Sequence, residues 1–209
     1  MTWQKRSLDI FLACVGILFF AIPFAVLFLF LMAVQGRPIF YLSERMKSPN
    51  EGFLLWKLRS MEMSAVNSGV TGGDKQARYT RYGKRLRRLR LDEIPQLWNV
   101  LKGDMSLVGP RPPLRLYVED FPELYQRVLT SRPGITGLAT LTYHQHETEL
   151  LAKCVTAEQT DTVYRRRCIP QKARLDLTYQ EHQSVCFDLE ILAQTVGKVF
   201  SVRKSRARK

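Results

Sequence analysis

The sequence is poor in the residues that build disulfide frameworks and metal centres. Its 209 residues include only four cysteines and three histidines. No two cysteines form a C-x-x-C motif, and the cysteines do not stand at metal-ligand spacing from the histidines. This pattern argues against a disulfide scaffold and indicates reduced thiols in a protein that faces the cytosol.

Acidic residues are scarce relative to basic ones. The chain has 19 Asp and Glu against 32 Lys and Arg, which gives a formal net charge of +13. Such a balance indicates an anionic partner: a nucleic acid, an anionic membrane face or a phosphorylated substrate. Gly72-Gly73 lacks the surrounding pattern of a phosphate-binding glycine loop. No helix-turn-helix, zinc or RNA-binding signature is present, so a membrane-tethered nucleic-acid binder is only an alternative.

Charge is absent altogether from residues 10–35, which read IFLACVGILFFAIPFAVLFLFLMAVQ. About 25 helical residues extend roughly 37 Å, enough to cross a hydrocarbon core of about 30 Å. The run is too long for a secretory signal, and no small-residue cleavage site follows it. It also lacks the polar face of a core helix. The segment is therefore predicted to be a membrane anchor.

Pro23 divides this anchor into two halves. An interior proline removes a helical hydrogen bond and kinks the helix, and each half of about 12 residues is too short to cross alone. Basic residues prefer the cytoplasmic side, and they flank both ends of the run. These are Lys5, Arg6, Arg37, Arg45 and Lys47. The pattern favours a re-entrant helix kinked at Pro23, with a single kinked span as the alternative.

The most concentrated chemistry lies in residues 86–112, LRRLRLDEIPQLWNVLKGDMSLVGPRP. Arginines precede the adjacent acids Asp92 and Glu93, and Pro95 suits the first turn of a helix that Gly103 would end. The acids would sit at the positive end of the helix dipole, which favours their ionised form. The Pro-flanked Arg111 is held in a rigid turn that suits bidentate phosphate binding. From spacing alone, surface ion pairs are an equally good reading of these charges.

This stretch closely resembles the core of the bacterial sugar transferases known as monotopic phosphoglycosyl transferases. The resemblance rests on LDEIPQL, NVL and GDMSLVGPRP within residues 91–112. It extends to Lys5-Arg6 with Asp9, to KLRSM at residues 57–61, and to RPGITG at residues 132–137. Beyond residue 137 the likeness thins, and His144 stands where many members have an arginine. His144 and His146 also raise the alternative of a metal pair, although nothing nearby in the sequence completes one.

The resemblance implies transfer of a sugar-1-phosphate from a UDP-sugar to polyprenyl (undecaprenyl) phosphate, with UMP leaving. It implies Asp92 as the nucleophile of a covalent intermediate and Glu93 as its partner. Both acids are expected to be ligands of Mg²⁺, with an orienting role as the alternative for Glu93. It implies phosphate or uridine contacts by motif position for Lys57, Arg59, Arg87 and Arg111. Without it, Lys57 and Arg59 would read as two solvated cations on one face of a strand. A non-catalytic scaffold of a glycan assembly complex is a further alternative.

The fold expected is helix-rich α/β (α+β). A re-entrant anchor at residues 1–37 joins one small catalytic domain at residues 38–200, which carries interfacial amphipathic helices, and a basic tail at residues 201–209 follows. The protein would lie on the cytoplasmic face of a bacterial inner (plasma) membrane, in contact with anionic lipid. A homo-oligomer is compatible with the sequence, which does not specify the donor sugar or the glycan pathway.

Several local predictions accompany this fold. Residues 39–42 and 53–58 are each expected to form a short strand, with an interfacial segment as the alternative, around a turn at residues 48–52. Residues 63–75 have the composition of a mobile loop. Residues 114–130 are expected to form a surface helix interrupted at Pro122, and residues 148–167 a helix broken at residues 168–170. In residues 187–200 an apolar stripe is expected to pack in the core, with membrane contact as the alternative. The stripe comprises Leu189, Leu192, Val196, Val199 and Phe200.

Overall fold

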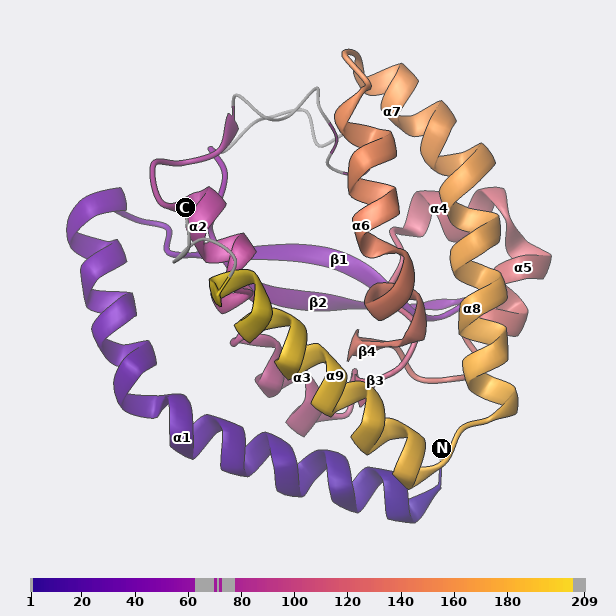
Figure 1. The fold of residues 1–209 in the computed structure, drawn as a ribbon, viewed down its shortest axis with the longest axis horizontal. Helices are drawn as coiled ribbons and strands as arrows, with labels where there is room; N and C mark the ends of the chain where they lie inside the picture. The colour runs from indigo at the N-terminus through magenta and orange to yellow at the C-terminus, as the bar shows by residue number, and fades with distance from the viewer. Residues whose placement is uncertain (1, 63–69, 71, 73–77, 205–209) are drawn as a thin grey trace.

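The computed structural model describes residues 2–62, 70, 72 and 78–204, with side chains up to residue 198. The predicted loop at residues 63–75 therefore lies mostly outside the described residues. The fold is a helix-rich mixture of helices and short strands (Figure 1). Its elements are α1 (Trp3–Gln35), β1 (Phe40–Ser48), β2 (Glu51–Leu58), α2 (Gly83–Arg88), η2 (Leu91–Glu93), α3 (Gln96–Lys102), β3 (Ser106–Val108), α4 (Arg115–Asp120), α5 (Pro122–Val128), β4 (Gly134–Thr136), α6 (Leu138–Ala152), α7 (Ala157–Val163), η3 (Tyr164–Cys168), α8 (Ile169–Glu181) and α9 (Val185–Lys204).

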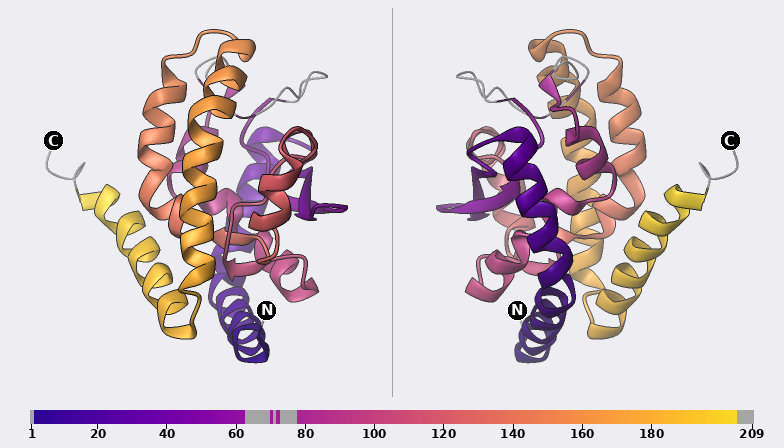
Figure 2. Two further views of the ribbon diagram at one scale, coloured as in Figure 1. Left: turned by 90° about the vertical axis from the view of Figure 1, so that its right-hand side faces the viewer. Right: turned by 90° about the vertical axis from the view of Figure 1, so that its left-hand side faces the viewer.

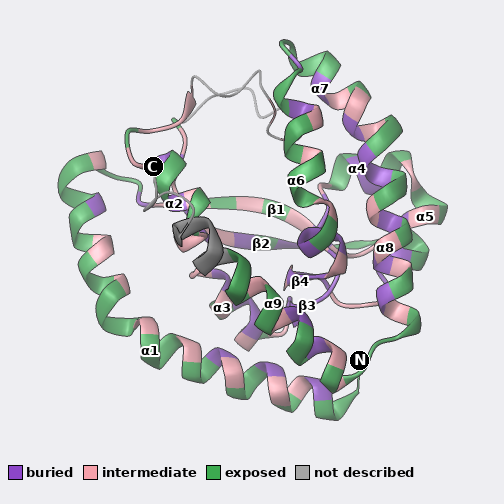
Figure 3. Ribbon diagram, viewed as in Figure 1, coloured by how far each residue is buried: buried purple, intermediate pink, exposed green. Residues whose placement is uncertain are grey.

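Helix α1 runs along the outside of the molecule. The Thr2 hydroxyl caps its first turn by accepting a hydrogen bond from the Lys5 amide at 3.3 Å. The helix is long and apolar enough to cross a membrane by length and composition, and most of its side chains are exposed (Figure 3). Its axis changes direction partway along (Figure 1), and Pro23 lies inside it. That the bend makes the helix re-entrant stays a prediction.

The N-terminal end of α1 is bonded to the rest of the molecule. The Lys5 ammonium donates hydrogen bonds to Asp188 Oδ2 at 2.5 Å, Val108 O at 3.0 Å and Tyr179 Oη at 3.2 Å. Asp9 Oδ1 accepts a hydrogen bond from the Leu107 amide at 3.0 Å, and its other oxygen accepts one from the Ser106 hydroxyl at 2.7 Å. These buried contacts attach α1 to β3, α8 and α9.

The other end of α1 is bonded to the segment that follows β2. The Gln35 side chain donates to the Arg59 carbonyl at 2.7 Å. In return, Arg59 Nη2 donates to the carbonyls of Gln35 at 2.6 Å and Gly36 at 3.0 Å. Carbonyls at the end of a helix lack intrahelical donors, so Arg59 satisfies groups that would otherwise need water. Both ends of α1 are thus attached to one body.

Strands β1 and β2 form an antiparallel hairpin around Pro49-Asn50, which confirms the predicted strands and turn. Strands β3 and β4 form a short parallel pair in a separate sheet. The turn after β3 lies against the turn before β4 so closely that a side chain on Gly109 would clash, its Cβ falling 2.3 Å from the Arg132 carbonyl oxygen. The two proline-rich motifs of the sequence therefore meet.

The helical second half differs from expectation in two places. Pro122 separates α4 from α5, as predicted. Residues 168–170 do not break a helix, because Pro170 lies in the first turn of α8, where its missing N–H costs nothing, and η3 leads into α8 as a π-helical turn. The break falls instead at residues 153–156, where the Thr156 hydroxyl caps α7. His144 is in helix α6.

Helix α9 does not bury its predicted apolar stripe as expected. Leu189 and Val196 are exposed, whereas Leu192 packs against the core and Ile191 is buried within it. The side chains of Val199 and Phe200, also in the predicted stripe, lie outside the described part of the chain. The helix leans away from the rest of the molecule toward its C-terminal end (Figure 2). It runs to Lys204, into the first residues of the predicted basic tail, whose remaining residues lie outside the described part of the chain.

Candidate active site

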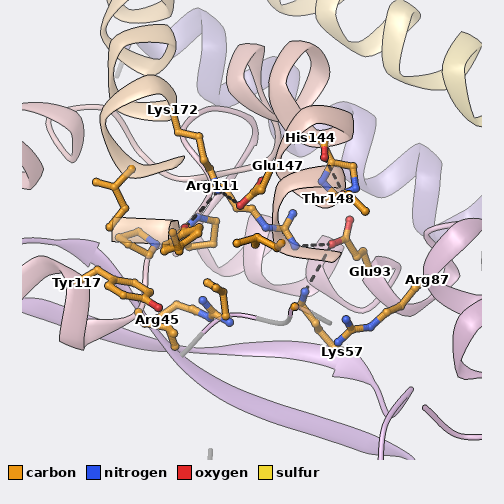
Figure 4. Close-up of a pocket in the computed structure, with 18 of the residues that line it drawn as sticks. Arg45, Lys57, Arg87, Glu93, Arg111, Tyr117, His144, Glu147, Thr148 and Lys172 are labelled. Atoms are coloured by element: carbon orange, nitrogen blue, oxygen red, sulfur yellow. Dashed lines mark hydrogen bonds and ion pairs between the residues drawn. The ribbon is translucent and has the colours of Figure 1, made fainter. Parts of the chain in front are cut away.

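The predicted catalytic residues line a cavity of about 510 Å³. One wall comes from β1 and β2, and another from α2, η2 and the turn that follows β3. Helices α6 and α8 close the side opposite the hairpin, as the close-up shows (Figure 4). A cavity of this volume is within the range of ligand-binding pockets.

Asp92 and Glu93 form the short 3₁₀ helix η2 at one end of this cavity, and both are buried. Arg90, two residues before Asp92, adopts a left-handed conformation with φ of 53°. The chain therefore turns between α2 and η2. Helix α3 follows, with Gly103 ending it at φ of 89°. Asn99 ties α3 to β2 by donating to the Leu54 carbonyl at 2.8 Å and accepting from the Trp56 amide at 3.1 Å.

Glu93 is surrounded by cations. Its Oε1 accepts a hydrogen bond from Arg111 Nη2 at 3.0 Å and lies 3.5 Å from Lys57 Nζ. Its Oε2 accepts from Arg90 Nη1 at 3.2 Å. Burial alone would raise the pKa of Glu93, but the charges of Arg111, Lys57 and Arg90 outweigh burial and hold this pKa well below its usual range. Glu93 is therefore ionised at neutral pH.

Asp92 differs from its neighbour. No hydrogen bond reaches its carboxylate from the residues that the structure describes. Burial and the negative charge of Glu93 raise the pKa of Asp92, while Lys57, Arg87 and Arg111 oppose this rise. The helix-dipole argument, which favoured the ionised form for both acids, is thus wrong about the direction for Asp92, because desolvation is the larger effect.

Three of the four predicted phosphate-binding cations meet at the acids. Lys57 comes from β2, Arg87 from α2 and Arg111 from the turn after β3. Burial and the nearby positive charge of Arg111 lower the pKa of Lys57 to about 8. Arg87 is oriented by hydrogen bonds to the Ser60 hydroxyl at 2.9 Å and the Tyr79 hydroxyl at 3.4 Å. Further cations line the same cavity: Arg45, Lys84, Arg88 and Arg90.

The structure does not bring Arg59 to this cavity. Strand β2 ends at Leu58, so the two-residue alternation that would place Arg59 beside Lys57 does not continue. Its guanidinium instead turns to the C-terminal end of α1. The prolines around Arg111 behave as predicted, because backbone hydrogen bonds hold their turn from both sides. These run from the Met46 amide to the Pro113 carbonyl at 3.1 Å and from the Gly134 amide to the Pro110 carbonyl at 2.8 Å.

The opposite end of the cavity contains polar residues that the sequence did not reveal. Lys172 of α8 donates to Glu147 Oε1 of α6 at 2.9 Å and to the Tyr164 hydroxyl of η3 at 3.3 Å. Asp176 lies one turn beyond Lys172 on α8, and Tyr125 reaches in from α5. The i, i+4 spacing of Lys172 and Asp176 was the only signal in the sequence. This spacing did not reveal that α5 and α6 both pack against α8.

His144 also lines the cavity, on α6. Desolvation, followed by the positive charges of Arg111 and Arg90, lowers the pKa of His144, so the imidazole is neutral at pH 7. His146 packs its ring against Tyr143 with centroids 5.3 Å apart. His144 therefore adds no positive charge to the cavity.

The acidic pair has the donor chemistry for Mg²⁺. This ion is usually held by one or two carboxylates together with substrate phosphates, rather than by a complete protein cage. The Asp92 oxygens receive no hydrogen bond from the described residues, and the two Glu93 oxygens retain lone pairs beyond those that the cations engage. A buried carboxylate pair beside several cations is suited to phosphoryl transfer, in which catalysis is mainly positioning and charge stabilisation.

The amino-acid sequence was also compared with known protein families. Residues 1–202 match the family model described as bacterial sugar transferase. The chain therefore belongs to the bacterial sugar transferase family.

Named relatives align over part of their own length. The chain is 44% identical over 56% of its length to a Bacillus subtilis protein provisionally named undecaprenyl-phosphate N-acetylgalactosaminyl 1-phosphate transferase. It is 39% identical over 66% of its length to the Aeromonas hydrophila UDP-N-acetylgalactosamine-undecaprenyl-phosphate N-acetylgalactosaminephosphotransferase. It is 32% identical over 94% of its length to the Escherichia coli UDP-glucose:undecaprenyl-phosphate glucose-1-phosphate transferase. These alignments cover 66%, 34% and 40% of the relatives' own lengths, respectively.

Proposed function

We propose that the protein transfers a sugar-1-phosphate from a UDP-sugar to undecaprenyl phosphate and releases UMP. The observation that carries this proposal is the buried Asp92–Glu93 pair, set among Lys57, Arg87 and Arg111 in one cavity. Substrates of this type carry the anionic phosphates that such cations bind. The names of the relatives supply the donor and acceptor classes.

In the first step an ionised Asp92 oxygen attacks the phosphorus that bears the sugar. The phosphorus–oxygen bond to the uridylyl phosphate breaks, and UMP leaves with the bonding electrons. Asp92 is the better candidate nucleophile because its carboxylate receives no hydrogen bond from the described residues, whereas Glu93 is engaged by cations through both oxygens. Lys57, Arg87 and Arg111 would bind the phosphate oxygens and stabilise the charge that develops.

In the second step a phosphate oxygen of undecaprenyl phosphate attacks the same phosphorus. The acyl phosphate bond breaks, the Asp92 carboxylate is restored, and the product is an undecaprenyl diphosphosugar. The exposed apolar surface of α1 supports a membrane location, and we place the cavity on the cytoplasmic face of the inner membrane. There the isoprenoid chain stays in the bilayer while its phosphate reaches Asp92.

Glu93, together with Asp92 before it reacts, would hold Mg²⁺. When bound, the ion would neutralise charge on the phosphates. The residues of this chain perform the remaining tasks: Asp92 forms and releases the covalent bond, and Arg111 orients both Glu93 and the phosphate.

The decisive experiment measures UMP release from purified protein given a panel of UDP-sugars and Mg²⁺ without any acceptor. The covalent route predicts a burst of about one equivalent per enzyme, which Asp92→Asn abolishes. Full turnover then requires undecaprenyl phosphate. A full burst from Asp92→Asn, or no UMP until both substrates are present, would eliminate the covalent intermediate. No turnover of any UDP-sugar would favour the non-catalytic scaffold or the nucleic-acid binder instead.

A further inference from the structure

The end of the cavity opposite Asp92 contains two largely buried residues, Asp176 and Tyr125, whose side chains border the cavity. Asp176 is 6% exposed and Tyr125 is 8% exposed. Neither side chain makes a hydrogen bond to any residue within the described ranges, and both border the cavity. Their polar atoms are not shut away from the cavity, so a molecule bound there can satisfy them. This end of the cavity therefore has the features of a binding site for a hydrogen-bonding ligand.

The neighbouring groups restrict the chemistry of that ligand. The Lys172 ammonium is already engaged by Glu147 and by the Tyr164 hydroxyl. Of the other charged groups, Arg45 lies near Tyr117 and Tyr164 on the hairpin side, whereas Asp176 is acidic, and burial raises its pKa to about 7. A phosphate would be repelled by Glu147 and Asp176. A neutral, planar group with both donors and acceptors fits better, because the carboxyl group and the phenol can each donate or accept and aromatic rings line the wall.

The geometry of the reaction indicates which part of the donor lies here. In phosphoryl transfer the attacking and leaving oxygens are roughly in line through phosphorus. The leaving nucleotide therefore extends away from Asp92, beyond the bound phosphates. The Asp92 carboxyl is close enough to feel the charges of Lys57, Arg87 and Arg111, whereas the charge that acts on Asp176 is that of Lys172. Arg111 lies between these two ends (Figure 4).

We propose that the lobe formed by Tyr125, Glu147, Tyr164, Lys172 and Asp176 binds the nucleoside of the leaving nucleotide, with Asp176 and Tyr125 recognising its base. This inference rests on the proposed function. A uracil ring carries one N–H between two carbonyl groups. The Asp176 carboxylate accepts a hydrogen bond from that N–H, and the Tyr125 hydroxyl donates to a carbonyl. Cytosine has an acceptor nitrogen in the place of the N–H, so the ionised Asp176 carboxylate selects against it.

The test is calorimetric titration of UMP, CMP, glucose 1-phosphate and inorganic phosphate into the full-length protein in lipid nanodiscs. Asp176→Asn and Tyr125→Phe are compared with wild type, and Glu181→Gln serves as control because Glu181 is an exposed carboxylate on the same helix. We expect wild type to prefer UMP over CMP. Asp176→Asn should weaken UMP binding roughly tenfold to a hundredfold and reduce the preference over CMP. Tyr125→Phe should weaken UMP binding less. The control should match wild type, and phosphate binding should stay unchanged throughout.

Unchanged UMP affinity in both variants would overturn the proposal, as would an equal loss of UMP and phosphate binding, which indicates a structural defect. Loss of glucose 1-phosphate binding with normal UMP binding would assign the lobe to the sugar and also overturn it. Thermal melting of each variant identifies misfolding. Turnover of a UDP-sugar combined with normal UMP binding by the variants would refute this inference alone. A wild-type protein that neither binds UMP nor releases it would refute the proposed function.

Discussion

The Lys5 ammonium and the Asp188 carboxylate form an ion pair of 2.5 Å between residues 183 positions apart, and solvent reaches almost none of either side chain. Tyr179 completes this contact by donating to the other Asp188 oxygen at 2.5 Å. The pair joins the first turn of α1 to α9, and the Lys5 bond to the Val108 carbonyl extends the contact to β3. The resemblance marked Lys5 through a short motif, but its partner was not evident from spacing.

Breaking this pair should destabilise the protein strongly. Lys5→Met leaves Asp188 buried without its cation, and removing one member of a buried pair typically costs about 3–5 kcal/mol. The double variant Lys5→Met/Asp188→Leu should recover part of that loss, because no charge remains uncompensated. Thermal unfolding in detergent measures both effects, with Lys153→Met at an exposed position as control. A single variant that melts with wild type would refute the structural role.

Arg111→Lys should lower turnover by roughly tenfold to a hundredfold with little change in melting temperature. Lysine keeps the charge but cannot form two parallel hydrogen bonds to phosphate or hold the Glu93 oxygen in the same geometry. Steady-state UMP release measures the effect, and Arg174→Lys at an exposed site on α8 is the matched control. Near-normal kinetics in Arg111→Lys would assign this arginine a structural or solvated role.

Glu93→Gln should slow the UMP burst about tenfold and raise the Mg²⁺ concentration needed for half-maximal rate. The amide binds the cation weakly and no longer neutralises Arg111, Lys57 and Arg90. Rapid-quench measurement of UMP across a Mg²⁺ series gives both quantities, and Glu190→Gln on the exposed face of α9 is the control. An unchanged Mg²⁺ dependence would exclude Glu93 as a ligand.

Both ends of α1 should lie on the cytoplasmic side. Single cysteines at Thr2 and Ser48, in a background from which the native cysteines have been removed, should resist an impermeant thiol reagent in intact spheroplasts. Both should react after permeabilisation, which serves as the positive control. Replacing Cys14 and Cys186 matters most, because these two are exposed. Labelling at Thr2 from outside would leave a single spanning helix.

Asp176→Asn should be more stable than wild type at pH 8, and this advantage should be smaller at pH 5. Burial raises the pKa of Asp176 to about 7, above its unfolded value, so the folded state holds the proton more tightly. Stability is then lost as pH rises from about 4 to 7, by up to about 4 kcal/mol. Asn cannot ionise and escapes this loss. The charge that acts on Asp176 is that of Lys172, and Tyr125 lies close enough for the charge of Asp176 to affect it. Melting curves at both pH values should therefore diverge for wild type and converge for the variant, and equal divergence in both would refute the prediction.

The parts of the fold that depend on local patterns were predictable. The uncharged run, the Pro49-Asn50 turn and the Pro122 interruption each follow from residues close in sequence. The break near Cys168 was misplaced because proline also suits the first turn of a helix. The stripe on α9 was misassigned because periodicity identifies an apolar face without identifying what covers it. Leu189 remains exposed, although it satisfies the same spacing as residues that pack.

The cationic half of the candidate site was predictable because its residues fall in recognisable motifs. Arg59 shares a motif with Lys57, but its role at the end of α1 depends on where β2 stops. The polar lobe was not predictable, since Tyr125, Glu147 and Asp176 come from three helices with no common motif. Their proximity follows from long-range packing of α5, α6 and α8, which the residue pattern of each helix does not encode.

The attachment of α1 at both ends has a consequence for how its length can vary. Lys5 and Gln35 are each bonded to fixed points on one body. An α-helix has 3.6 residues per turn, so inserting one residue rotates everything beyond it by about 100°. Such an insertion would turn either Lys5 or Gln35 away from its partners, whereas replacing one apolar residue by another between them would not. Insertions and deletions within α1 should therefore be far less tolerated than substitutions.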